Sequence, residues 1–499
     1  MAEPAAPPLG LPTKIGYGVG AVAFGVGVTT LSGQVLQLYF NQVVGAPAVW
    51  VGTALMISTM VDAVFDPMVG RWSDNLRSPF GRRHTFMYAS AIPAALGFIL
   101  MWHAPAGLST LGLFAFMTGL LLFVRLACSL FEIPSLALAP ELAPTYDDRT
   151  SLLAWRFLFL VMGGALASGV LYLVFLRQDA ANPLGVLNRD RYTQFGWVAA
   201  ALMFFAILAS ALSTHRRIRH LHVPPVRSLT LSETLAEVAA TFRHRPLAIL
   251  MVTNLLIAVA AGVTAGLGTY LYLHFWRLKP QELAAVLFFG PFASFLALGL
   301  TPAMAKRFGK KPTMLACYGS WLLTATVPMG LNLCHLLPGP GTALIAILTG
   351  SFFLGVGFAV GCHIVLNSML SDASEDVAVK TGRRSEGVLF AAYGLMAKVG
   401  DGLGAFVAGL LLTLVHFPAK AMPGTVDPGI VRTLVVVNLP VIAIFNLCAI
   451  ACVSFYRLDR AQHEANLAEL RRREALAGAI EINPSEPGAP VVGAAAIAE

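Results

Sequence analysis

Long apolar stretches alternate with short polar segments along almost the whole chain. Each stretch has about the 20 residues that an α-helix needs to cross the hydrocarbon core of a bilayer. The pattern therefore predicts an all-α integral membrane protein. The twelve expected transmembrane helices cover residues 15–40, 47–70, 85–103, 108–131, 152–176, 194–214, 247–273, 281–304, 312–333, 341–370, 386–415 and 431–455.

The longest interior polar segment, residues 215–246, divides the spans into two sets of six. The halves also echo each other, because Gly81-Arg82-Arg83 follows the second span and Gly309-Lys310-Lys311 follows the eighth. Two parallel six-helix repeats with a substrate site at their interface are typical of this arrangement. We expect an N-terminal bundle over 1–214, a central cytoplasmic loop over 215–246, a C-terminal bundle over 247–456 and a cytoplasmic tail over 457–499.

The two long polar segments differ in character. Apolar residues recur with helical period over residues 229–242, which predicts an amphipathic helix on the membrane surface within the central loop. In the tail, residues 460–477 are rich in Ala, Glu, Leu and Arg and predict a solvated or membrane-surface helix. The Pro-, Gly- and Ala-rich residues 481–499 are expected to be disordered. We expect no transport role for the tail.

Composition and charge agree with a membrane location. Hydrophobic residues make up 57% of the chain and charged residues 12%, against about 25% charged residues in soluble proteins. The net charge of +8 comes from basic loops, which favours cytoplasmic loops over a nucleic-acid partner. We therefore expect a multi-pass protein of the plasma (inner) membrane, a monomer with both termini in the cytoplasm. The basic loops are 71–84, 215–246, 305–311 and 371–385, and the loops near 41–46, 104–107 and 334–340 carry no Lys or Arg.

A few charged residues stand within or at the ends of the apolar spans. Asp62 and Asp66 lie four residues apart in the second span and so share one helix face. Lys398 and Asp401 lie in the eleventh span, and Glu132 and Arg156 stand near predicted helix ends. A charge at the bilayer centre costs at least about 2.5 kcal/mol, and buried charges are usually functional. The alternatives are a helix-end charge whose side chain reaches the interface and a static ion pair that only packs the helices.

The chemistry of these groups points to a coupling ion. Two carboxylates with nearby hydroxyls or carbonyls form an oxygen site that suits Na⁺, so Asp62 and Asp66 are candidate metal ligands. Alternatively, one carboxyl binds a proton, because two close carboxylates favour protonation of one of them. Lys398 would approach the pair in one conformation and release it when the cation or proton binds. That exchange would couple ion and substrate.

Enzyme motifs are missing from the sequence. It has no Gly-Lys-Ser/Thr phosphate loop and no Cys-x-x-Cys pair, and His274, His335 and His363 lack metal-ligand spacing. The Gly16-Tyr17-Gly18-Val19-Gly20 string lies in a predicted span and indicates close helix packing. We therefore expect neither catalytic residues nor a cofactor, and no ligand except the substrate and a coupling ion.

Five motifs, in order and spacing, give the chain a resemblance over about residues 14–455. They are Lys14-Ile15-Gly16-Tyr17-Gly18; Asp62 to Asp66-Pro67 with Gly70, Asp74 and Gly81-Arg82-Arg83; Glu132-Ile133-Pro134 with Arg149-Thr150 and Arg156; Ser371-Asp372 with Arg384-Ser385-Glu386-Gly387; and Lys398-Val399-Gly400. The chain resembles the glycoside–pentoside–hexuronide cation symporters of the major facilitator superfamily, typified by melibiose permease. The resemblance implies the major facilitator fold, two six-helix bundles that alternate access to a central site.

The resemblance also implies roles for individual residues. Asp62 and Asp66 match the cation-site acids, Lys398 matches a lysine between the cation and substrate sites, and Glu132 matches an acid that contacts both ligands. Arg156 matches a substrate-site arginine, and Tyr17 and Tyr393 are candidate lining aromatics. The candidate cytoplasmic gate comprises Asp74, Arg82, Arg83, Arg149, Asp372, Glu375, Arg383 and Arg384.

Two departures bear on the substrate. The family's sugar-binding acid of the first span should fall near Gly25, and its aromatic after the Ile-Pro motif should fall at Leu136. A galactoside needs hydroxyl acceptors and an aromatic plate, so we expect a site of different specificity. The substrate is then a glycoside or other small polar solute, or, as in the family's sodium-dependent lysophosphatidylcholine symporters, an amphiphile. A receptor or scaffold that does not transport is the remaining alternative.

Overall fold

The computed structural model describes residues 9–143, 146–180, 182, 184–218, 242–381, 386–458, 462–466, 468–470 and 472. Within these residues, twelve helices or helix pairs are long and apolar enough to cross a membrane. The predicted all-α fold with twelve membrane spans is therefore confirmed. The central-loop helix expected over 229–242 lies, except for Phe242, outside the described residues, as do residues 481–499 of the tail.

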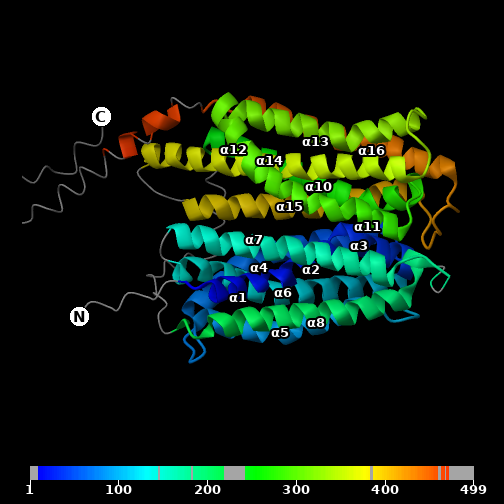
Figure 1. Ribbon diagram of the computed structural model, residues 1–499, viewed down its shortest axis with the longest axis horizontal. Coiled ribbons are helices and arrows are strands. Elements are labelled where there is room, and N and C mark those ends of the chain that lie inside the picture. Colours follow the sequence, from blue (N-terminus) through cyan, green and yellow to red (C-terminus); the bar gives the residue numbers. More distant parts are fainter. Residues whose placement is uncertain are drawn as a thin grey trace, which may run out of the picture.

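Two bundles of helices lie side by side along the long axis (Figure 1). The first, blue to green in Figure 1, contains α1 (Leu11–Val19), α2 (Ala21–Thr30), α3 (Gly33–Leu38), α4 (Ala48–Asn75), α5 (Arg82–Met101), α6 (Thr110–Leu142), α7 (Tyr146–Gly169) and α8 (Arg189–His215). The second contains α10 (Arg245–Tyr270), α11 (Pro280–Phe289), α12 (Ala293–Phe308), α13 (Lys310–Leu333), α14 (Thr342–Thr381), α15 (Glu386–Leu414) and α16 (Pro428–Ser454).

The glycines of the two repeated basic motifs, one in each half, have the same backbone conformation. Gly81 precedes α5 with φ 82°, and Gly309 precedes α13 with φ 90°. Both values lie in the region that glycine enters without a steric penalty, so each glycine turns the chain directly into the next helix. The same turn therefore places Arg82-Arg83 and Lys310-Lys311 at the first residues of equivalent helices. We call this end of the molecule the basic end.

Several helices run well beyond their predicted boundaries. We predicted that the fourth span ends at residue 131 and the tenth at residue 370, but α6 continues to Leu142 and α14 to Thr381. The apolar pattern marks where the chain leaves hydrocarbon, whereas a helix continues until a cap or a change of direction ends it. As a result, Glu132 lies well inside α6 rather than at its end.

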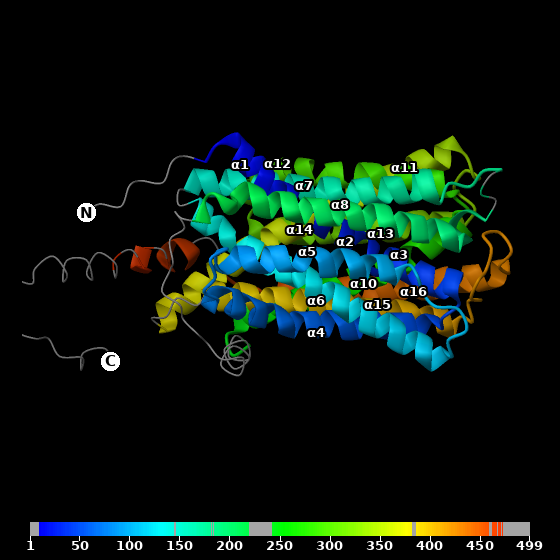
Figure 2. The ribbon, with the colours of Figure 1, turned by 90° about the horizontal axis from the view of Figure 1, so that it is seen from below.

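The halves meet where α4 packs against α15 (Figure 2) and α3 packs against α10. At the end opposite the basic end, hydrogen bonds join them directly. The Tyr270 hydroxyl donates to Asn41 Oδ1 at 2.9 Å, and Gln42 donates to the carbonyl of Pro418 at 3.0 Å and accepts from the Ala421 amide at 2.8 Å. These hydrogen bonds close the interface at that end of the molecule.

Candidate functional site

A lysine and two carboxylates join the two halves at mid-depth. Lys398 of α15 donates through Nζ to Asp62 Oδ2 at 2.7 Å, and it also donates to Asp66 Oδ2. Both acids come from one face of α4, as their spacing predicted, and the Asp62 side chain is 9% exposed. The sequence therefore identified a group whose members are more than 330 positions apart in the chain yet form one charged contact.

Two further groups reach Asp62 from α6. The Ser129 hydroxyl donates to Asp62 Oδ1 at 2.8 Å, and Arg125 Nη1 lies 3.8 Å from Asp62 Oδ2. Neither residue was among the predicted site residues. Arg125 was detectable, because it stands inside the predicted fourth span and the cost of burying its charge is the same as for Asp62. Ser129 gives no comparable signal, since hydroxyls are common in helices that cross membranes.

Glu132, Arg156 and Tyr17 form a second polar group. Arg156 Nη2 lies 2.6 Å from Glu132 Oε1, its Nη1 donates to the Ser135 hydroxyl at 2.9 Å, and its guanidinium lies 5.6 Å from the centre of the Tyr17 ring. The Tyr17 hydroxyl donates to the Ser135 carbonyl at 3.0 Å. Arg156 is 5% exposed and Tyr17 is fully buried, so both are held by protein groups.

A cavity of about 430 Å³ lies between the halves beside these charges, within the range of about 300–1,000 Å³ that is usual for small-molecule sites. Its charged lining consists of Asp62, Asp66, Arg125, Glu132, Lys398 and Asp401. Much of the remaining wall is apolar, with Phe24, Val28, Leu31 and Leu55 from the first half and Ala261 and Ala265 from the second.

Several predicted lining residues lie elsewhere. Tyr17, Arg156 and Tyr393 are not among the residues that line the cavity. Tyr393 is instead hydrogen-bonded through its hydroxyl to His363 Nδ1 at 3.0 Å. Gly25 packs so closely on α7 that a Cβ there would lie 2.1 Å from the Leu160 carbonyl oxygen. No side chain fits at that position, so the missing acid is a consequence of helix packing, and Phe24 beside it faces the cavity instead.

The candidate gate residues form ion pairs at the basic end. Arg83 pairs with Asp74 at 3.1 Å and with Glu141 at 2.6 Å, and Arg82 also pairs with Glu141. In the second half, Lys310 pairs with Asp372 at 2.6 Å. Arg149 is exposed on α7, and Arg383 and Arg384 lie outside the described residues. Glu141 was not predicted, because it falls in the part of α6 that extends beyond the expected span.

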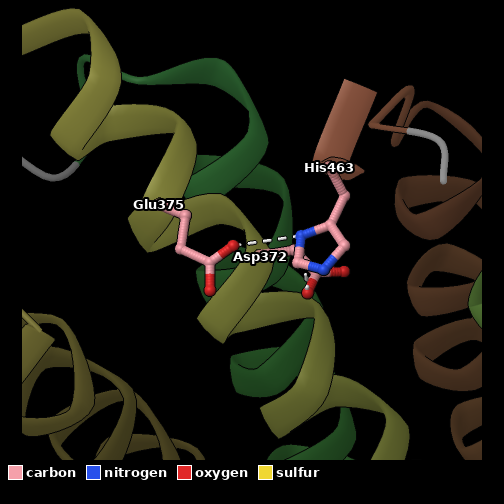
Figure 3. A group of neighbouring side chains, drawn as sticks. All are labelled: Asp372, Glu375 and His463. Atoms are coloured by element: carbon pink, nitrogen blue, oxygen red, sulfur yellow. Dashed lines mark ion pairs between the residues drawn. The ribbon is translucent and has the colours of Figure 1, made fainter. Parts of the chain in front are cut away.

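The described part of the tail also contacts the gate. His463 Nδ1 lies 3.0 Å from Glu375 Oε2 and 3.4 Å from Asp372 Oδ1, and the two acids come from α14 (Figure 3). One turn further, the buried Asn466 donates to Asp376 Oδ1 at 3.3 Å. The tail therefore packs on the helix that carries the candidate gate acids, a contact that its composition did not predict.

Comparison with known proteins shows the family of the chain. Residues 16–460 match the family described as MFS/sugar transport protein. The chain belongs to this family. Its members related to this chain include a putative glycoside/cation symporter of Escherichia coli, YagG, which is 24% identical over 93% of this chain and 96% of its own length. The isoprimeverose transporter of Lactiplantibacillus pentosus is 24% identical over 89% of this chain and 88% of its own length.

Other proteins similar to this chain are also named as transporters. A putative sulfoquinovose importer of Escherichia coli is 24% identical over 93% of this chain and 95% of its own length. Among solved structures, the nucleoside transporter NupG superposes with a TM-score of 0.60 over 90% of this chain and 99% of its own, at 14% identity, which shows a shared fold. The resemblance to the glycoside–cation symporters is thus confirmed. The chain is a multi-pass membrane transporter for a small molecule and not an enzyme.

Proposed function

We propose that this transporter is a cation-coupled symporter that imports a small sugar-type solute by alternating access, driven by Na⁺ or H⁺. The observation that carries the proposal is the Lys398 ammonium, which bridges Asp62 and Asp66 across the two halves. A cation or a proton that binds these carboxylates competes directly with Lys398 for the same oxygens. Ion binding would therefore break a contact that holds α15 against α4.

The surroundings of the two acids support a cation site. Asp62 and Asp66 contribute carboxylate oxygens, and the Ser129 hydroxyl lies at Asp62, so hard oxygen ligands suited to an alkali cation gather at one point. The site lies beside a cavity at the interface of the two repeats, where transporters of this architecture bind substrate. We place the basic end and both termini in the cytoplasm and take the protein to act as a monomer in the inner membrane.

A second candidate substrate is an amphiphile such as a lysophospholipid. Phe24, Val28 and Leu31 give one side of the cavity an apolar wall, against which an acyl chain would pack. The glycoside and isoprimeverose names of the relatives favour a sugar-type solute for this chain as well, and the uptake experiment below compares the two classes.

The function is tested with purified protein in proteoliposomes. Uptake of isoprimeverose, sulfoquinovose and lysophosphatidylcholine is measured under an inward Na⁺ gradient, under an inward H⁺ gradient and without either. We expect one class of substrate to accumulate only when a gradient is imposed, because coupled uptake needs the ion to bind with the solute. Equal uptake with and without gradients would contradict ion coupling, and uptake of the lysolipid alone would favour the amphiphile.

Melibiose uptake is expected to be weak or absent. Gly25 is packed against the α7 backbone, and Leu136 is not among the residues that line the cavity, so neither position supplies an acid or an aromatic ring for a galactoside. The measurement is melibiose uptake in transport-deficient cells that express the protein, with cells expressing melibiose permease as control. Robust sodium-dependent uptake would show that other residues replace both missing contacts.

A further inference from the structure

Arg125 is the least satisfied basic group of the site among the described residues. Its guanidinium lines the cavity and makes no hydrogen bond with any other described residue, and its Nε is enclosed without a partner. Within the described part of the chain, Arg125 forms one ion pair, the 3.8 Å contact from Nη1 to Asp62 Oδ2. Arg125 therefore presents donors to the cavity that the protein itself does not use.

Asp62 has closer partners than Arg125. Lys398 donates to it at 2.7 Å and Ser129 at 2.8 Å, whereas the contact with Arg125 is too long for a hydrogen bond. An arginine whose role was only to neutralise Asp62 would be expected to form the bidentate pair that guanidinium and carboxylate favour. Arg125 therefore lies beside Asp62 without a hydrogen bond to it, and it forms part of the lining of the cavity.

The other acids of the cavity have different neighbours. Asp66 is held by Lys398, and Glu132 is held by Arg156 at 2.6 Å. Asp401 lines the cavity but forms no ion pair with a described residue, so it is the one acid that competes for Arg125 when Asp62 is engaged. A coupling cation on Asp62 and Asp66 would weaken the attraction between Asp62 and Arg125 and leave Asp401 as the acid of the cavity that can still attract the guanidinium.

We infer that Arg125 is a specificity-determining residue and that it selects a small organic anion, bound through a carboxylate or a sulfonate. The inference rests on the proposed function and narrows its substrate class. The guanidinium offers a planar fork of N–H donors that matches two oxygens of an anionic group. Cation binding to the two aspartates then prepares the anion site, because it removes the negative charge that Arg125 faces. Cation and anion therefore bind with positive cooperativity.

The test uses three probes that share one sugar ring: glucose, glucuronate, and sulfoquinovose, which is 6-deoxy-6-sulfoglucose. Binding to the purified full-length protein is measured by thermal shift in Na⁺, in choline and at lowered pH, since a ligand that prefers the folded state raises the unfolding midpoint. We expect at least one charged probe to bind about tenfold or more tightly than glucose, and to bind more weakly without the coupling ion. The carboxylate and the sulfonate are compared to show which geometry Arg125 accepts.

Three variants distinguish an Arg125 that binds an anion from an Arg125 that only stabilises the structure. Arg125→Gln should abolish the preference for the charged probe, Arg125→Lys should retain part of it because it keeps the charge without the fork, and Asp401→Asn should strengthen binding of the charged probe. Arg177→Gln is the matched control, because Arg177 is 62% exposed outside the cavity. If Arg125→Gln does not fold, the lysine variant and Asp401→Asn still decide the question.

The proposal is overturned if glucose binds as tightly as both charged probes, if neither charged probe binds, or if the Arg125 variants keep the wild-type preference. These outcomes differ from failure of the symporter proposal. Cation-driven uptake of a neutral solute would refute the anion site and leave coupling intact, whereas an anion that binds through Arg125 but is never driven by an ion gradient would refute coupling alone.

Discussion

Asp62→Asn and Asp66→Asn are each expected to abolish cation-driven accumulation of substrate. Each change removes one of the two carboxylates that Lys398 bridges, so the remaining site has too few anionic oxygens to draw a cation or proton away from the lysine. Accumulation in proteoliposomes under an ion gradient should fall about tenfold or more, which corresponds to about 1.4 kcal/mol or more of lost coupling. Expression should remain close to wild type, because asparagine preserves the size of the side chain.

Asp190→Asn is the matched control for this pair, since Asp190 is exposed in the first turn of α8, away from the cavity. It should accumulate substrate as the wild type does. The cation-site assignment is wrong if both span-two variants also reach wild-type accumulation. A loss that is confined to one variant would indicate a site formed mainly by that acid.

The order and number of the helices follow from the sequence because burial in a bilayer imposes a simple rule. Each crossing needs about 20 apolar residues, and twelve such stretches are visible without any knowledge of packing. Helix ends are different, since α6 and α14 extend past their apolar parts into polar sequence. In the extended part of α6, Glu141 forms ion pairs with Arg82 and Arg83, which join residues about 60 positions apart in sequence and leave no local signal.

The candidate site, like the fold, could be predicted from the sequence only in part. The expected closeness of Lys398 to Asp62 and Asp66 could be inferred because an isolated charge within the membrane is costly. The side of a helix that a residue occupies could not be inferred in the same way. Arg156 and Tyr17 share the Ser135 group inside the first bundle, whereas Arg125 and Phe24 face the cavity. That outcome depends on the rotation of α1, α2, α6 and α7 against one another, which a single sequence does not specify.

Two sets of contacts between the halves connect ion binding at the aspartates with movement of the halves. At the end opposite the basic end, Tyr270 and Gln42 bond across the interface, and at mid-depth Lys398 adds the charged contact with α4. If an ion replaces Lys398 at the acids, the mid-depth contact is lost while the hydrogen bonds at the closed end remain. In the proposed transport cycle the halves would also have to separate at the closed end, so the ion and the substrate would act on the same interface.

Lys398→Ala is expected to block or uncouple transport and to lower stability. Two carboxylates here lose a shared ammonium and are left uncompensated. The loss should lower stability by less than the about 3–5 kcal/mol of a fully buried pair, because the Lys398 side chain is 32% exposed. Without the competing lysine, a cation should bind the two acids more tightly. We therefore expect Na⁺ or lowered pH to raise the unfolding midpoint of the variant by more than that of the wild type, while uptake no longer responds to the gradient.

The measurement is the unfolding midpoint of purified protein over a series of Na⁺ concentrations and pH values, together with gradient-driven uptake in proteoliposomes. Lys306→Ala, at an exposed position in the last turn of α12, is the control and should match the wild type in both assays. Wild-type uptake by Lys398→Ala would remove the lysine from the coupling mechanism. A variant that loses uptake but gains no additional stabilisation from either ion would show that Lys398 holds α15 on α4 without competing for the cation site.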